Sequence, residues 1–161
     1  MSEEIRVLAV RQPWASLIVE GLKTIEVRSS PTNIRGRVAI YGTSRCVTNS
    51  EENAFLRMFS GFEDDDLLSF QNREIAERCL WGTRTFGFVV GTVEIVDSTQ
   101  CSGDLEYKLY ENEHFAPAEY FAEENTYFWH LRRPVKFSNP INYTPPRGAV
   151  RWSKTVLPEG Y

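Results

Sequence analysis

A helix enclosed between two strand-like segments limits the fold of this sequence more than any other feature. Residues 5–10 alternate apolar side chains with polar or small ones, which predicts a strand that stops before Pro13. Pro13 suits the first position of a helix, where its missing N–H is not needed, and Gly21 suits the left-handed residue just after a helix. The pattern therefore predicts a short helix, a tight turn and a second strand, all before residue 29.

Further strand patterns follow, but helices do not alternate with them. Residues 36–43 predict a strand, and residues 85–96 predict another, in which two glycines mark a bulge or a sharp bend. Residues 126–131 and 134–137 are expected to be closing strands. Strands of uneven length without β-α-β alternation favour an α+β fold. We therefore predict a small, mostly antiparallel β-barrel flanked by helices.

Acidic residues are concentrated in the middle of the chain. The net charge of −4 divides into +3 for residues 1–48, −12 for residues 49–125 and +5 for residues 126–161. A negative protein disfavours nucleic acid, but the two basic ends would form a positive patch if the fold brought them together. Residues 49–84 also contain helical patterns. We predict one domain over residues 1–161, with an acidic helical insertion at about 49–84.

Three charged side chains follow the predicted turn. In GLKTIEVR, residues 21–28, they are Lys23, Glu26 and Arg28, and their neighbours are apolar or β-branched. On a strand, alternation places Glu26 and Arg28 on the same face. Such a set is either a group of solvated surface ion pairs or the lining of a cleft in which the charges converge on a ligand.

Several other kinds of site have no support in the sequence. The three cysteines are far apart and form no C-x-x-C pair, which indicates neither a disulfide framework nor a zinc site. Neither histidine has a carboxylate or a cysteine at a metal-ligand spacing, so we predict no metal site and no cofactor. The sequence contains no apolar run of membrane-spanning length and no signal-peptide pattern. We therefore expect a cytoplasmic protein without a membrane partner.

Taken together, these segments resemble the ASCH (activating signal cointegrator homology) domain of the PUA-like superfamily. The resemblance rests on QPWAS at residues 12–16, on the G-x-K-x-x-E-x-R motif of residues 21–28, and on the RGR at residues 35–37 that leads into a strand. It is strong over residues 5–45 and absent from residues 49–84. It implies a PUA-like barrel with a cleft between the barrel and the helix that carries QPWAS.

The resemblance also implies that this cleft binds RNA or another nucleic acid, or a modified nucleoside. Lys23 and Arg28 would contact phosphates or base edges, while Glu26 would hold one of these cations or accept from an exocyclic amine. Aromatic side chains would stack on an unpaired base. The predicted contact residues are Trp14, Lys23, Glu26, Arg28, Arg35, Arg37, Tyr41, Ser44 and Trp152.

Two alternative functions are open. The family includes amidohydrolases of N4-acetylcytidine and proteins with ribonuclease activity. In the amidohydrolases the motif lysine is catalytic, a threonine stands at the place of Glu26, and a glutamate lies outside the motif, for which Glu94 and Glu113 are candidates here. If this chain is an enzyme, Lys23 and Glu26 are its expected catalytic residues. The other alternative is a protein-interaction module of a transcriptional coregulator-like assembly, with the acidic segment 49–125 as the surface that binds a protein partner.

Overall fold

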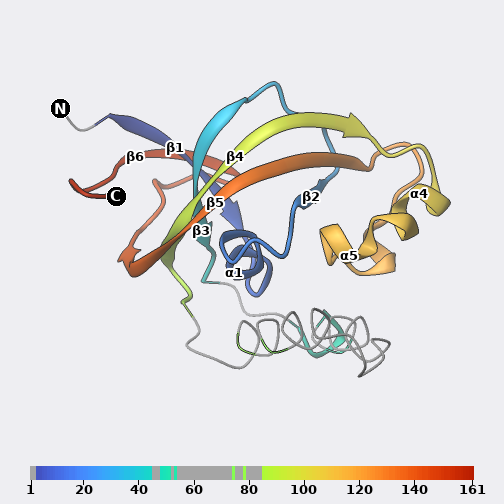
Figure 1. The fold of residues 1–161 in the computed structure, drawn as a ribbon, viewed down its shortest axis with the longest axis horizontal. Helices are drawn as coiled ribbons and strands as arrows, with labels where there is room; N and C mark the ends of the chain where they lie inside the picture. The colour runs from blue at the N-terminus through green and yellow to red at the C-terminus, as the bar shows by residue number, and fades with distance from the viewer. Residues whose placement is uncertain (1–2, 45–47, 52, 54–73, 75–77, 79–84) are drawn as a thin grey trace.

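A six-stranded sheet forms the body of the computed structural model, which describes residues 3–44, 48–51, 53, 74, 78 and 85–161. The strands are β1 (Glu4–Val10), β2 (Ile25–Arg28), β3 (Gly36–Gly42), β4 (Phe88–Gln100), β5 (Tyr127–Asn142) and β6 (Trp152–Val156). The helices are α1 (Trp14–Val19), α4 (Asp104–Leu109), α5 (Glu111–His114) and the 3-10 helix η1 (Ala118–Tyr120). Figure 1 shows the long strands β4 and β5 curving side by side over α1. Most of the predicted acidic insertion at 49–84 lies outside the described residues, whereas residues 85–125 of the predicted protein-binding surface are described.

The strand order is β2-β5-β4-β3-β1-β6. Four neighbouring pairs are antiparallel, and β1 with β3 is the parallel pair. The parallel pair arises because α1 and β2 lie between β1 and β3 in the chain and return it in the original direction. The predicted α+β class, mostly antiparallel and flanked by helices, is confirmed.

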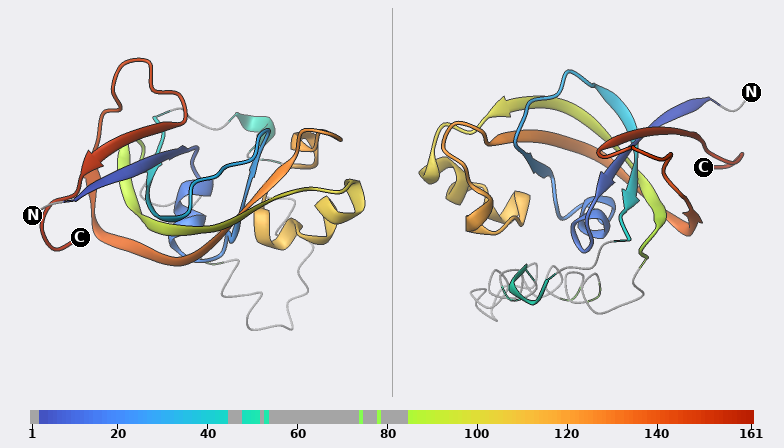
Figure 2. Two further views of the ribbon diagram at one scale, coloured as in Figure 1. Left: turned by 90° about the horizontal axis from the view of Figure 1, so that it is seen from above. Right: turned by 180° about the vertical axis from the view of Figure 1, so that it is seen from behind.

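One part of the fold prediction is corrected, because the sheet does not close into a barrel. Its edges are β2 and β6. The opening between β2 and β1 is spanned by a side chain, since Nη2 of Arg28 donates to the carbonyl oxygen of Ala9 at 2.8 Å. Figure 2 shows the strong curvature of the sheet from two further directions.

The helix α1 fills the concave side of the curved sheet. Its residues Ala15, Leu17 and Ile18 are fully buried in an apolar cluster that also takes side chains from β1, β3, β4 and β5. The helix lies where the pattern predicts it, and Gly21 after it has a φ of +84°. Pro13 is the residue just before the helix rather than its first residue. This packing fixes the position of the segment that enters β2.

The predicted glycine bend in β4 is confirmed at Gly91. The register between β4 and β5 shifts between Val89 and Gly91. A Cβ at residue 91 would lie 2.2 Å from the carbonyl oxygen of Val135, so the two strands can approach this closely only because residue 91 is glycine.

A second pair of helices, α4 and α5, packs against β2 and the beginning of β5. Tyr107 of α4 lies in an apolar cluster with Ile25 of β2 and Phe128 of β5. The backbone of α5 is joined to the turn before β2, because the N–H of Thr24 donates to the carbonyl oxygen of Glu113 at 2.9 Å. The segment after α5 is thereby placed opposite α1. No helix in the described part of the chain is long and apolar enough to cross a membrane.

Candidate functional site

A cavity of about 390 Å³ opens between α1, β1, β2 and the segment around η1. This volume falls within the range of roughly 300–1,000 Å³ that is usual for small-molecule sites. The lining residues are Ala9, Val10, Arg11, Trp14, Lys23, Glu26, Val27, Arg28, Thr43, Ala116, Tyr120 and Val150. The structure thus brings Trp14, Lys23, Glu26 and Arg28 of the predicted contact set to one cavity.

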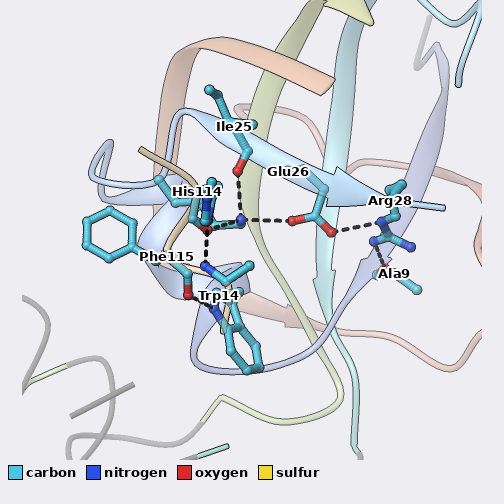
Figure 3. A network of polar contacts seen from close by, with 9 residues as sticks. Ala9, Trp14, Ile25, Glu26, Arg28, His114 and Phe115 are labelled. Carbon is cyan, nitrogen blue, oxygen red and sulfur yellow. Dashed lines mark hydrogen bonds and ion pairs between the residues drawn. The ribbon is translucent and has the colours of Figure 1, made fainter. Parts of the chain in front are cut away.

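Lys23 lies at one end of a chain of polar contacts. Figure 3 shows how this chain continues from Glu26 to Arg28 and Ala9. Nζ of Lys23 donates to the carbonyl oxygen of Ile25 at 2.7 Å and to that of His114, and it lies 3.2 Å from Oε2 of Glu26. An ammonium group has three protons, so each of them has an acceptor. Burial lowers the pKa of Lys23, while the charge of Glu26 opposes this shift.

Glu26 lies between two cations. Its Oε1 accepts from Nε of Arg28 at 2.8 Å, and its Oε2 faces Nζ of Lys23. Burial by itself raises the pKa of Glu26, but the charges of Lys23 and Arg28 and their hydrogen bonds outweigh it and hold the pKa below its usual value. Glu26 is therefore ionised at neutral pH, and two cations share one buried carboxylate.

Trp14 forms the apolar wall of the cavity next to this chain. The side chain is 5% exposed, and Nε1 donates to the carbonyl oxygen of Phe115 at 2.7 Å. Its ring centroid lies 6.2 Å from that of Tyr120, with an angle of 46° between the planes. Trp14 is therefore both a core residue and a fixed surface of the cavity, and its side chain is held by Phe115 and Tyr120.

The outer rim of the cavity is held by Glu51. Arg11 donates to its carboxylate through both Nη1 and Nη2, with 2.7 Å between Nη2 and Oε2, and the hydroxyl of Tyr120 donates to Oε1. The backbone N–H of Thr48 donates to Oε2 at 2.9 Å, and the hydroxyl of Thr48 accepts from the N–H of Glu51 at 3.3 Å. This reciprocal pair is a capping box.

The charge of Glu51 is stabilised by these contacts. Burial raises its pKa, but the hydrogen bonds from Thr48, Tyr120 and Arg11 outweigh burial and lower the pKa to about 2. The T-x-x-E spacing of residues 48–51 is visible in the sequence and could have identified this helix start. The approach of Arg11 and Tyr120 to it could not have been inferred from the sequence, because both come from distant segments.

The remaining predicted contact residues do not line the cavity. Arg35 pairs with Asp97 at 3.3 Å, and Arg37 pairs with Glu94 at 3.1 Å, on the outside of the sheet. Ser44 is exposed just after Thr43, which is a lining residue.

The two other predicted aromatic contacts are placed elsewhere in the fold. Tyr41 is buried in a separate apolar cluster, where its ring lies edge-on to Tyr143 at 5.4 Å. Trp152 is half-buried and stacks on Trp129, with 5.9 Å between ring centroids and 11° between planes. Neither ring reaches the cavity lining.

Neither candidate for a catalytic glutamate outside the motif lies at the cavity. Glu94 forms ion pairs with Arg37 and Arg133, and Glu113 is exposed.

His114, by contrast, is fully buried beside Lys23, which the sequence did not indicate. Its Nδ1 accepts from the N–H of Ala116 at 2.9 Å, so Nε2 carries the proton that is donated to the carbonyl oxygen of Tyr107 at 2.8 Å.

The ring of His114 is uncharged at neutral pH. Burial lowers its pKa to about 4. Its contribution to the cavity is the backbone carbonyl that accepts from Lys23. Within the described residues, no group of three or more histidine, cysteine, aspartate or glutamate side chains is arranged to hold a metal ion.

Comparisons with known proteins agree with this fold. The family model of the ASCH domain matches residues 8–140. The structure of an ASCH protein from Zymomonas mobilis is similar, with a TM-score of 0.54 and 19% sequence identity, over 96% of this chain and 87% of that one. No curated protein sequence matches this chain.

The structures of two variants of the Zymomonas mobilis ASCH protein are similar to this chain to the same degree. The serine-to-alanine variant has a TM-score of 0.53 and 19% identity, over 96% of this chain and 88% of that one. The tyrosine-to-phenylalanine variant has a TM-score of 0.54 and 18% identity, over 98% and 92%. At such identities the likeness establishes a shared fold, and the use of the cavity has to be argued from its own residues.

Proposed function

This chain belongs to the ASCH domain family, and on that premise we propose that its cavity binds one unpaired nucleotide of an RNA strand. The observation that carries the proposal is a cavity of about 390 Å³ with a buried carboxylate, held between two cations, beside an apolar wall. A nucleobase has apolar faces and a polar edge, and unpaired bases are bound through both. Residues of both β1 and β2 line this cavity.

Within this cavity, Glu26 and Arg28 are proposed to read the edge of the base. A carboxylate has about four lone-pair sites. Lys23 and Arg28 each approach one oxygen of Glu26, so acceptor capacity is left for a ligand N–H. A guanidinium has five N–H donors, of which Arg28 uses one for Glu26 and one for Ala9. An acceptor and a donor thus stand side by side, as a base edge requires.

Lys23 has a different role in this proposal from the one expected from the motif. Its three protons already have acceptors in the protein, so a phosphate or base contact would have to break one of these bonds. We assign Lys23 to positioning Glu26. The ammonium fixes the carboxylate and compensates its charge, while the ligand contacts come from Glu26 and Arg28.

The proposal is tested by the binding of a fluorescently labelled single-stranded RNA octamer of mixed sequence, measured by anisotropy. We expect the wild type to bind this strand more tightly than the matching duplex. Because a specific base contact is worth about 1–3 kcal/mol, Glu26→Gln should weaken binding about fivefold or more. The matched control is Glu94→Gln, which removes a carboxylate outside the cavity. Equal affinities of all three proteins, or a preference for the duplex, would contradict the proposal.

A hydrolase that uses the same cavity is the second candidate, and the burial of Lys23 favours it. Burial lowers the pKa of Lys23, which is the direction that a lysine base requires. The three acceptors around Nζ oppose deprotonation, which is why we place binding first. Incubation with N4-acetylcytidine decides between the two. Product formed by the wild type and not by Lys23→Met would make hydrolysis the leading function.

A further inference from the structure

We propose that the loop between β5 and β6, residues 143–151, binds the phosphates of the strand whose base enters the cavity. Arg147 and Arg151 are the residues that would contact them. This inference rests on the proposed function and deepens it, because it names the residues that would hold the RNA strand outside the cavity. A free nucleoside carries no phosphate for these arginines to bind.

Val150 places this loop at the mouth of the cavity. It is a lining residue, yet its side chain is 91% exposed. The next residue is tied to the cavity wall, since the carbonyl oxygen of Arg151 accepts from the N–H of Ala9 at 2.9 Å. Ala9 itself lines the cavity. The part of the loop around Val150 therefore borders the cavity.

The guanidinium groups of Arg151 and Arg28 both lie over the ring of Trp129. The Cζ atoms of Arg28 and Arg151 lie 5.6 Å and 5.7 Å from the centroid of the same Trp129 ring. Nη1 of Arg151 donates to Oγ of Ser30 at 2.8 Å, which fixes its direction. Arg151 is thus fixed beside a ring that also contacts Arg28, a lining residue of the cavity.

The charges of the two loop arginines are not neutralised within the described residues. Lys136 and Lys154, also on exposed parts of β5 and β6, each pair with a glutamate. Neither Arg147 nor Arg151 has a carboxylate at ion-pair distance in the part of the chain that the structure describes. Arg147 is exposed in a turn closed by a 3.0 Å hydrogen bond from the N–H of Ala149 to the carbonyl oxygen of Pro146.

These features fit a phosphodiester backbone better than another anion. Arginine is a strong phosphate ligand because its planar donors match phosphate oxygens. In single-strand binding, a positively charged path follows the backbone while the bases are held in apolar sites. Here the uncompensated arginines lie in the same loop as Val150, which lines the cavity. An acidic protein thereby presents one local positive edge where a strand would leave the cavity.

The test measures the affinity of the labelled RNA octamer at several KCl concentrations. Each phosphate that a protein cation neutralises on a single strand contributes about 0.7 to the steepness of log K against log salt. The double variant Arg147→Gln/Arg151→Gln should therefore lower the slope by roughly 1.4. The control is Arg132→Gln, which removes an exposed arginine that does not line the cavity. It should leave the slope at the wild-type value.

The single variant Arg147→Gln keeps the test valid if the double variant misfolds. Arg147 is exposed in its turn, and glutamine keeps a polar side chain there. This variant should lower the slope by about 0.7 on its own. An unchanged slope in both loop variants, with tight binding by the wild type, would overturn this inference and leave the proposed function standing. Absence of binding by the wild type would overturn both.

Discussion

At the scale of single residues, the cavity depends on a buried lysine whose ammonium group binds protein acceptors instead of water. Lys23 is 2% exposed, and its contacts join three places: the start of β2, the end of α5 and the carboxylate of Glu26. A buried ion pair adds little net stability over an apolar pair, but removing one partner leaves the other charge uncompensated. The lysine therefore matters most for keeping Glu26 ionised and in place.

Replacing Lys23 by methionine should lower the free energy of unfolding by about 1–3 kcal/mol, since the buried carboxylate of Glu26 then keeps only one of its two cations. Urea denaturation followed by tryptophan fluorescence measures this change. The control is Lys154→Met, which breaks the exposed pair with Glu4. An exposed pair is worth about 0–1 kcal/mol. A decrease below about 1 kcal/mol for Lys23→Met would show that Lys23 is not the partner on which Glu26 relies.

At the scale of elements, the sheet is shaped by the close approach of β4 and β5. The register shift at Gly91 lets the two long strands bend around α1, and Val19 of α1 packs at the same position. A Cβ at residue 91 would lie 2.8 Å from Cγ1 of Val19 as well as 2.2 Å from the carbonyl oxygen of Val135. The bend of the sheet and the position of α1 are therefore set at one residue.

Substitution of Gly91 by alanine should be strongly destabilising, because the new methyl group meets backbone that cannot move without breaking the β4–β5 pairing. Overpacking of this kind costs about 1–3 kcal/mol or more. Thermal unfolding followed by circular dichroism measures it. Gly103→Ala is the matched control, since a Cβ there meets nothing within 4 Å. If both variants melted at the same temperature, the close approach of β4 and β5 would not be what requires glycine at residue 91.

Local pattern explains which elements the sequence could predict. Pro13, Gly21 and the motif residues Lys23, Glu26 and Arg28 belong to one short segment, where spacing alone places them. The same alternation could have placed Tyr41. Val38 and Ile40 face α1. Ala39 and Tyr41 alternate with them and therefore face the opposite side of the sheet, away from the cavity.

The other half of the cavity could not be predicted from local pattern. Tyr120, Ala116 and Val150 reach the lining from segments far beyond the motif in the sequence, and their placement depends on how α5 and the β5–β6 loop pack. A closed barrel is what the strand pattern and the family resemblance suggest. The four residues of β2 instead pair with β5 and leave the side toward β1 open, which no short-range pattern specifies.

At the scale of the whole molecule, Glu51 joins parts of the chain that are distant in sequence. Its carboxylate links Arg11 at the end of β1 with Tyr120 of η1, across the mouth of the cavity. The two walls of the cavity are also joined by the bond from Trp14 to Phe115 and by the contacts of Lys23. The shape of the site is thus a property of the assembled fold rather than of one element.

The stabilisation from Glu51 should depend on pH in a defined direction. Its pKa falls from 4.5 to about 2 on folding, so the folded state binds fewer protons and the stabilisation is present above about pH 4.5. It is lost as the pH falls toward 2. Urea unfolding of the wild type and of Glu51→Gln should therefore differ more at about pH 7 than at about pH 3. For the control Glu4→Gln, at an exposed pair, the difference should be small at both values. An equal gap for Glu51→Gln at both pH values would contradict this prediction.

The position of β1 between β3 and β6 has a consequence for the order in which the protein folds. β1 pairs Val7 with Ala39 but also Glu4 with Val156, so one of its edges is completed by neighbours close in sequence and the other by the far end of the chain. Contacts between distant residues form late, because a long loop must close before they contribute any stability. We therefore expect β6 to join last. Since the loop that carries Val150 and Arg151 leads directly into β6, one border of the cavity takes shape only in the final step of folding.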